Sequence, residues 1–275
     1  MSGPGAAPAD RPLLVLRGCA ILYLLFLVLL PLAALTFKAL EAGPAQISRI
    51  LLAPVTLNAV YLSLWTALLI SILNGVMGLA AAWVIVRYPL PFKGFLTAVL
   101  DLPFAIPTLV TGLLLVTLFG PQSAAGGWLG QKGVFIAYAK PAILLSLAFI
   151  TLPFVIRSIE PVLRELDPAE EEAALTLGAG KWRIFFKVLL PPLLPALGTG
   201  MVQSFARSLA EFGAIAIASG NRPFDTLTAS MHIFGEIESG RTQAAAVVSL
   251  LLLLISLGLV YFTRYLERLM GATNG

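Results

Sequence analysis

The chain has 275 residues, of which 59% are hydrophobic and only 12% are charged, and its mean hydropathy is +0.93. Soluble domains carry about 25% charged residues, so this composition excludes an ordinary soluble protein and indicates one that spans a membrane. The formal net charge of +4 is modest, and in a membrane protein it indicates basic loops rather than nucleic-acid binding.

Six apolar stretches are long enough to cross a hydrocarbon core of about 30 Å as α-helices, and strand-like alternation is absent. The sequence therefore predicts an all-α integral membrane protein with six transmembrane helices. Residues 18–263 are expected to form this membrane domain, between an N-terminal tail of residues 1–17 and a C-terminal tail of residues 264–275. Residues 1–10 of the first tail are small and polar, which predicts disorder. The six spans are expected at about residues 18–37, 57–86, 95–119, 135–156, 193–217 and 244–262.

The third of these spans contains two prolines in the sequence DLPFAIPT. Pro103 and Pro107 each remove a backbone hydrogen-bond donor, which predicts a kink or a broken helix. Thr108 and Thr111 follow directly after the second proline. Their hydroxyls are placed either to line a pore or to satisfy the carbonyls that the kink frees, and the sequence leaves both interpretations open.

The segment between the fourth and fifth spans, residues 167–191, is the longest polar and charged stretch of the chain. Asp167 can cap a helix, and Pro168 suits the first position of that helix. Gly178 is expected to end the helix, because glycine readily adopts the left-handed conformation. A second, short amphipathic helix is expected over about residues 181–190. Its apolar face would comprise Trp182, Phe185, Phe186 and Leu189.

This segment resembles the EAA motif of ATP-binding-cassette (ABC) importer permeases in three features that occur in register. They are Glu172-Ala173-Ala174, Gly178-Ala179 and Leu190-Pro191. The resemblance implies a type I ABC importer permease fold, whose cytoplasmic coupling helices dock in a cleft of a separate ATPase. The residues that it assigns to docking are Glu172, Ala173, Ala174, Gly178, Ala179, Trp182, Phe185 and Pro191. The alternative is a solvated helix that lies on the membrane surface.

The basic residues predict the orientation of the chain. With six spans and both termini in the cytoplasm, the segments inside carry more Lys and Arg than the segments outside. Cytoplasmic loops are enriched in these residues, so this orientation is favoured over the reverse. It places residues 167–191 in the cytoplasm, as docking to an ATPase requires.

The fifth span carries two ionisable residues, Arg207 and Glu211, which are four positions apart and would share a helix face. Ionisable groups inside a membrane are costly, and they mark either a structural pair or a transport path. In the second interpretation Arg207 lends positive potential to an anion path, because a guanidinium fork matches a tetrahedral oxyanion. Ser204, one turn earlier, would add a hydroxyl donor. The sequence leaves both interpretations open.

The same stretch, FARSLAEFGA, resembles a segment of sulfate, thiosulfate and molybdate permeases. The segments DLPFAIPT, LPFVIRSIEPVL and SGNRP resemble the CysT-type branch of the sulfate/thiosulfate family. The resemblance implies a multi-pass importer subunit in the bacterial cytoplasmic (inner) membrane, with both termini in the cytoplasm. The expected partners are a homologous second permease subunit, two ATPase subunits, an extracytoplasmic sulfate-binding protein and the lipid bilayer, but no nucleic acid. ATP and Mg²⁺ would bind to the ATPase subunits, and no cofactor is expected in this chain.

Three other functions compete with a sulfate permease: a molybdate or tungstate permease, a self-sufficient secondary anion transporter and a membrane-embedded enzyme. A secondary transporter would carry its own coupling-ion site, often within inverted repeats, and the sequence shows no convincing repeat. An enzyme or a metal site needs a cluster of reactive or ligating side chains. The chain has one histidine, His232, and one cysteine, Cys19, so neither an active site nor a metal site is expected.

Overall fold

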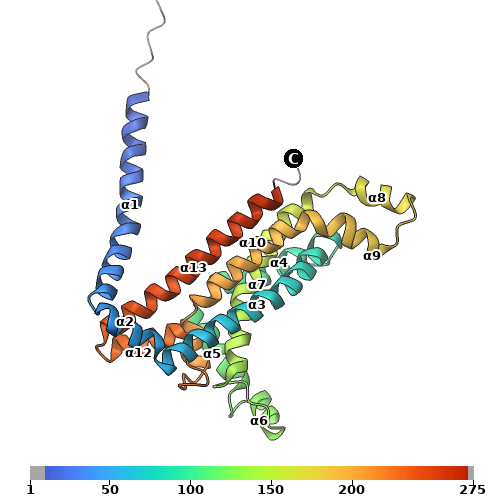
Figure 1. The fold of residues 1–275 in the computed structure, drawn as a ribbon. Coiled ribbons are helices and arrows are strands. Elements are labelled where there is room, and N and C mark those ends of the chain that lie inside the picture. The colour runs from blue at the N-terminus through green and yellow to red at the C-terminus, as the bar shows by residue number, and fades with distance from the viewer. Residues whose placement is uncertain (1–9, 272–275) are drawn as a thin grey trace, which may run out of the picture.

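The computed structural model describes the backbone of residues 10–271 and the side chains of residues 16–261. Within this range every regular element is a helix, which confirms the predicted all-α class (Figure 1). The tail predicted for residues 1–10 lies outside the described residues, apart from Asp10, which begins α1. In chain order the elements are α1 (Asp10–Leu40), α2 (Gly43–Leu52), α3 (Pro54–Arg87), α4 (Lys93–Ala105), α5 (Thr108–Phe119), α6 (Ala124–Gln131), α7 (Lys140–Glu165), α8 (Pro168–Thr176), α9 (Lys181–Ile184), the π-helical turn η1 (Phe185–Leu189), α10 (Leu190–Leu209), α11 (Gly213–Ala218), α12 (Ala229–Glu238) and α13 (Thr242–Gly271).

Five helical segments of the described chain are long and apolar enough to cross a membrane, and α4 with α5 makes a sixth if the two count as one span. These two helices are bent by 109° relative to each other. Pro107 lies in the break between them, and Pro103 lies inside α4. The predicted break in the third span is therefore confirmed, and its prolines account for it.

Helices α3, α7 and α10 pack together and form the core of the bundle. One apolar cluster between them contains Ala82, Val155, Ile159 and Leu193. Glycine allows the helices to approach closely, because a Cβ atom at Gly78 would lie 2.7 Å from Cγ1 of Val155. The side-chain amide of Asn74 in α3 donates a hydrogen bond to Thr151 Oγ1 in α7 at 2.8 Å. Such polar contacts fix how the helices align along their length.

Helix α1 lies apart from this core, and its N-terminal half projects away from the other helices (Figure 1). Its apolar side chains there, such as Leu22 and Phe26, are exposed. Near its C-terminal end, Ala39 is buried against Ala246 and Val247 of α13. The exposed part of α1 is therefore suited to contact with lipid.

The fifth span differs from its prediction in two respects. The second docking helix is not separate, because α9, η1 and α10 run on as one helical segment from Lys181 to Leu209. The prediction that the span continues to residue 217 is also wrong, since α10 ends at Leu209 and α11 begins only at Gly213. At this break Oε1 of Glu211 accepts a hydrogen bond from the backbone N–H of Ala214 at 3.1 Å. A side chain that caps the backbone competes with the helix, and an apolar sequence pattern does not reveal it.

Candidate functional site

The turns of the docking loop, residues 167–191, are set by contacts within the loop itself. Oδ1 of Asp167 accepts a hydrogen bond from the N–H of Ala169 at 2.9 Å and caps α8, with Pro168 at its first position. At the other end Gly178 has a φ of +79°, and the N–H of Ala179 donates to the carbonyl of Ala174 at 3.0 Å. This is the left-handed glycine ending that the sequence predicts, because the bond from Ala179 reaches back across the last turn.

The docking loop presents an apolar surface to its surroundings. Leu177 is 87% exposed and Trp182 is 77% exposed, and the Trp182 ring stacks on Phe186, which is also exposed. Large apolar side chains that cluster in the open mark surfaces that bind a partner. Of the other residues assigned to docking, Glu172, Ala173, Gly178 and Pro191 are exposed, and Ala174, Ala179 and Phe185 are half-buried.

The four residues expected on one apolar face of the second docking helix do not share a surface. Leu189 is buried, and Phe185 packs edge-on against Trp83 of α3 with ring centroids 5.5 Å apart. Trp182 and Phe186 remain exposed. The physical reason is the π-helical turn η1, which widens the helix and changes the direction of the side chains that follow. The contact with Trp83 is one that sequence reasoning missed, because it joins segments about a hundred residues apart.

Arg207 and Glu211 form the expected ion pair at the end of α10. Nη2 of Arg207 lies 2.9 Å from Oε2 of Glu211, and the Glu211 side chain is 1% exposed whereas that of Arg207 is 33% exposed. The two do not share a helix face, since Glu211 lies beyond the last residue of α10. The hydroxyl of Ser230 in α12 donates to the Glu211 carbonyl at 2.7 Å. Glu211 is therefore held on several sides, and Arg207 is the more accessible partner.

The hydroxyl residues near this pair lie in two places. Ser204 is fully buried and donates to Thr151 Oγ1 in α7 at 2.8 Å, so its hydroxyl joins two helices. Thr108 and Thr111 lie on α5, which packs against α11. A Cβ atom at Gly213 would come within 2.4 Å of the Thr108 hydroxyl, and the buried Thr111 hydroxyl has no hydrogen-bond partner among the described residues. The structure thus brings the two threonines to the break beside Glu211, and it places Ser204 elsewhere.

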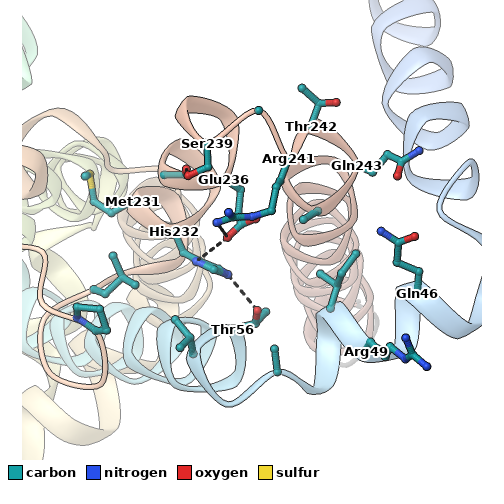
Figure 2. A pocket seen from close by; sticks show the side chains of 18 of the residues that line it. Gln46, Arg49, Thr56, Met231, His232, Glu236, Ser239, Arg241, Thr242 and Gln243 are labelled. Carbon is teal, nitrogen blue, oxygen red and sulfur yellow. Dashed lines mark hydrogen bonds and ion pairs between the residues drawn. The ribbon is translucent and has the colours of Figure 1, made fainter.

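A cavity of about 820 Å³ lies at the end of the bundle opposite the docking loop, between α2, the start of α3, α12 and the start of α13 (Figures 1 and 2). His232 lies at its centre, with Nε2 at 3.0 Å from Thr56 Oγ1 and Nδ1 at 4.0 Å from a carboxylate oxygen of Glu236. The Arg241 guanidinium donates two hydrogen bonds to the same carboxylate, at 2.6 and 2.9 Å. Two further cations, Lys38 and Arg49, also line the cavity. Sequence reasoning missed this site.

The charges of the cavity follow from these contacts. Burial lowers the pKa of His232, and this outweighs the nearby Glu236 carboxylate, which acts in the opposite direction. The hydrogen bond from Arg241 lowers the pKa of Glu236. Near neutral pH the cavity therefore holds a neutral histidine beside an ionised carboxylate.

Helix α12 connects the cavity to the break at Glu211. On one side it carries His232 and Glu236 into the cavity. On the other, Ser230 binds the Glu211 carbonyl, and the ring of Phe234 lies 5.1 Å from that of Phe212. Helix α12 therefore contacts both the cavity and the residues at the break beside the Arg207–Glu211 pair.

Comparison with known proteins agrees with this architecture. Residues 74–271 match the protein family described as binding-protein-dependent transport system inner membrane component. The chain is 39% identical to the sulfate transport system permease protein CysT of Escherichia coli (strain K12) over 254 residues, which cover 92% of both chains. It is also 39% identical to the probable sulfate transport system permease protein cysT of Nephroselmis olivacea, over 90% of this chain and 87% of that protein.

Two solved structures share the fold. A bacterial ABC transporter involved in the import of the acidic polysaccharide alginate matches with a TM-score of 0.77 at 18% identity, over 94% of this chain and 96% of that chain. A bacterial alginate ABC transporter in complex with an alginate pentasaccharide-bound periplasmic protein matches with a TM-score of 0.76 at 19% identity, over 94% of each chain. At these identities the likeness concerns the fold alone.

Proposed function

The chain belongs to the family of binding-protein-dependent transport system inner membrane components, and on that basis we propose that it carries sulfate or thiosulfate across the cytoplasmic membrane. It is a multi-pass permease subunit of an ABC importer, as the EAA-like segment predicts. The observation that carries the substrate assignment is the 39% identity to the sulfate permease of Escherichia coli along 92% of both chains. A molybdate or tungstate permease is the second candidate, because FARSLAEFGA resembles a segment of those permeases too.

An importer of this family works with a binding protein and an ATPase. We assign the ATPase to the docking loop, where Leu177, Trp182 and Phe186 are exposed and Glu172 lies on the open face of α8. An ATPase cleft would cover this apolar surface, and the removal of that surface from water would stabilise the complex. The complex would contain two ATPase subunits, which bind ATP and Mg²⁺, and a homologous second permease subunit.

The orientation follows from docking. The docking loop and both termini would lie in the cytoplasm, and the cavity end would face the extracytoplasmic sulfate-binding protein. The excess of Lys and Arg in the segments placed inside supports this arrangement. In Figure 1 the C-terminal end of α13 lies on the side of α8 and α9, whereas α2, α6 and α12 lie at the other end.

The anion path is assigned to the break between α10 and α11. The Arg207 guanidinium is partly open, its partner Glu211 is held in place by the backbone, and Thr108 and Thr111 lie on the facing helix. A divalent anion in a low-dielectric span needs positive potential, which Arg207 supplies and Glu211 moderates, so that the ion is not trapped. Ser204 would first have to give up its hydrogen bond to Thr151.

The experiment that tests the function uses the complete complex of both permease subunits, the ATPase and the binding protein in proteoliposomes. We expect binding protein loaded with sulfate or thiosulfate to stimulate ATP hydrolysis and uptake. Stimulation by molybdate or tungstate alone would transfer the assignment to the second candidate. Sulfate transport by this chain without the ATPase would instead indicate a secondary transporter and contradict the proposal.

A further inference from the structure

The last residue of α3, Arg87, reaches across to the docking loop. Its Nη1 donates a hydrogen bond to Oε2 of Glu171 in the first turn of α8 at 3.2 Å. The Arg87 side chain is 23% exposed, so the contact is partly shielded from solvent. It ties the docking loop to a helix that is not adjacent to it in the sequence.

This contact uses only part of the Arg87 guanidinium. Its Nε and Nη2 atoms are buried and have no hydrogen-bond partner among the described residues. Buried donors without an acceptor are unfavourable, and arginine often binds a carboxylate through two parallel hydrogen bonds instead of one. The pair is therefore joined by a single hydrogen bond, and Nη2 of Arg87 remains available to donate a second one to the same carboxylate.

An aromatic contact beside the ion pair secures the other arm of the loop. The Arg87 guanidinium carbon lies 5.4 Å from the ring centroid of Trp83, one turn earlier in α3. Trp83 packs edge-on against Phe185 of η1, whose ring in turn meets Phe186 at 5.1 Å. The last turn of α3 thus contacts α8 through the Arg87–Glu171 pair, and it contacts η1 through the rings of Trp83 and Phe185.

Helix α3 also extends to the opposite end of the molecule. Its 34 residues correspond to about 50 Å of helix. Near its start, Thr56 contacts His232 in the cavity, and along its length it packs against α7 and α10. One continuous helix therefore joins the docking end, the core and the cavity.

We propose that Arg87 is a positioning residue for energy coupling, which locks the docking loop to α3 so that a movement of α8 driven by the ATPase is passed to the core. The inference rests on the proposed function. A small shift of α8 that brings the second oxygen of Glu171 to Nη2, while Nη1 keeps its bond to Oε2, makes the pair two-pronged. The two forms of the pair then favour two positions of the loop.

The test measures the ATP hydrolysed per sulfate transported by the complete complex, together with the amount of ATPase that co-purifies. Arg87→Met removes the pair and is expected to raise ATP per sulfate about two- to tenfold, the range that follows from losing one partly exposed hydrogen bond of ordinary strength. Arg87→Lys keeps the charge but cannot form the fork, so an intermediate value is expected. A purely structural role would lower the amount of complex without changing this ratio.

Lys93→Met is the matched control, because it removes a cation from the same end of the bundle at a side chain that has no ion-pair partner among the described residues. Its ratio should equal that of the wild type. If the Arg87→Met complex fails to assemble, the Glu171→Gln complex provides the test. This variant removes the charge of the pair but keeps the shape of a partly exposed side chain, so it should still assemble. An assembled Arg87→Met or Glu171→Gln complex with the wild-type ratio overturns the proposal. Absence of sulfate-stimulated hydrolysis in the wild type would contradict the proposed function instead.

Discussion

The docking loop and the cavity lie at opposite ends of the molecule, and the sequence builds them in different ways (Figures 1 and 2). The docking loop is continuous, and its own residues set its turns, with Asp167 at the start of α8 and Gly178 after its end. The cavity draws its lining from several separate segments, and the contact between Thr56 and His232 joins residues 176 positions apart. A local turn is therefore encoded where it occurs, whereas the cavity exists only after distant helices have packed.

The two ends also offer different surfaces to a partner. The docking loop is a projecting apolar surface that includes Leu177 and Trp182, and it fits a partner that supplies a groove. The cavity is concave and adds charged side chains to an apolar lining, with Glu236 between His232 and Arg241, so it is sensitive to charge and to pH. Variants at each end should therefore fail in different ways.

The largest effect is expected between the two ends, at Arg207. Arg207→Ala leaves the buried Glu211 carboxylate without its cation. Loss of one partner of a buried pair destabilises a protein by about 3–5 kcal/mol, and we expect the lower end of this range because Arg207 is partly exposed. We expect uptake of labelled sulfate to fall about 100-fold or more, and Arg207→Lys to retain more of it. If Arg207 serves the anion path, the double variant Arg207→Ala with Glu211→Ala assembles normally but still transports poorly. Uptake near the wild-type rate by that double variant, at equal membrane abundance, would show that the pair is only structural.

The next largest effect is expected from a variant that disrupts the docking loop and leaves the cavity unchanged. Gly178 has a φ of +79°, and a Cβ atom there would meet nothing within 4 Å, so a branched side chain at this position strains the backbone without a Cβ clash. We expect at least about a tenfold loss of co-purified ATPase, with normal insertion of the membrane helices. Gly180→Val is the matched control, because Gly180 is equally open but has an ordinary φ of −71°. Equal ATPase binding by the two variants would contradict the assigned role of Gly178.

The same contrast explains what the sequence could and could not predict. The break at Pro107, the cap at Asp167 and the left-handed Gly178 were predictable, because each depends on the residue itself and its immediate neighbours. The end of α10 at Leu209 was not, because the apolar pattern does not reveal the cap that Glu211 makes to Ala214, and the bond from Ser230 to the Glu211 carbonyl comes from 19 residues away. The same holds for Arg87 and His232, whose partners are brought close only by helix packing. The sequence pattern therefore predicts spans and turns, but it does not predict the contacts between helices that are far apart in the sequence.

A smaller effect is expected when one exposed tryptophan is removed from either end of the molecule. Trp182 and Trp128 are both exposed, the first on the docking loop and the second on α6 at the other end (Figure 1). Trp182→Ala removes a large apolar contact with the ATPase, so we expect weaker ATPase binding, by about tenfold, without loss of folded permease. Trp128→Ala should leave ATPase binding unchanged. Equal losses in the two variants would show that the docking surface is not confined to residues 167–191.

The smallest effect is expected in the cavity, where His232 is the group that titrates nearest neutral pH. Its pKa in the folded protein lies below the ordinary value of 6.5, because burial disfavours the charged imidazole. Between these two pKa values the unfolded chain binds a proton that the folded chain does not. The stability of the cavity end is therefore lost as the pH falls below about 6.5. Glu236, whose pKa is lowered from 4.5, adds its own loss only at more acidic pH.

Hydrogen exchange of α12 measures this loss at the place where it occurs. Comparison of the wild type with His232→Gln at the same pH removes the intrinsic pH dependence of exchange, and glutamine can keep a hydrogen bond to Thr56. We expect the two proteins to exchange alike at pH 7.5, and α12 to open more readily in the wild type at pH 5.5, while α8 shows no difference between them. The charges that face His232 are Glu236, Arg241 and the more distant cations Lys38 and Arg49. If the carboxylate dominated over burial, protonation would instead stabilise the cavity, and α12 of the wild type would be the better protected of the two at pH 5.5. The sign of the difference therefore decides whether burial or the carboxylate controls this end of the molecule.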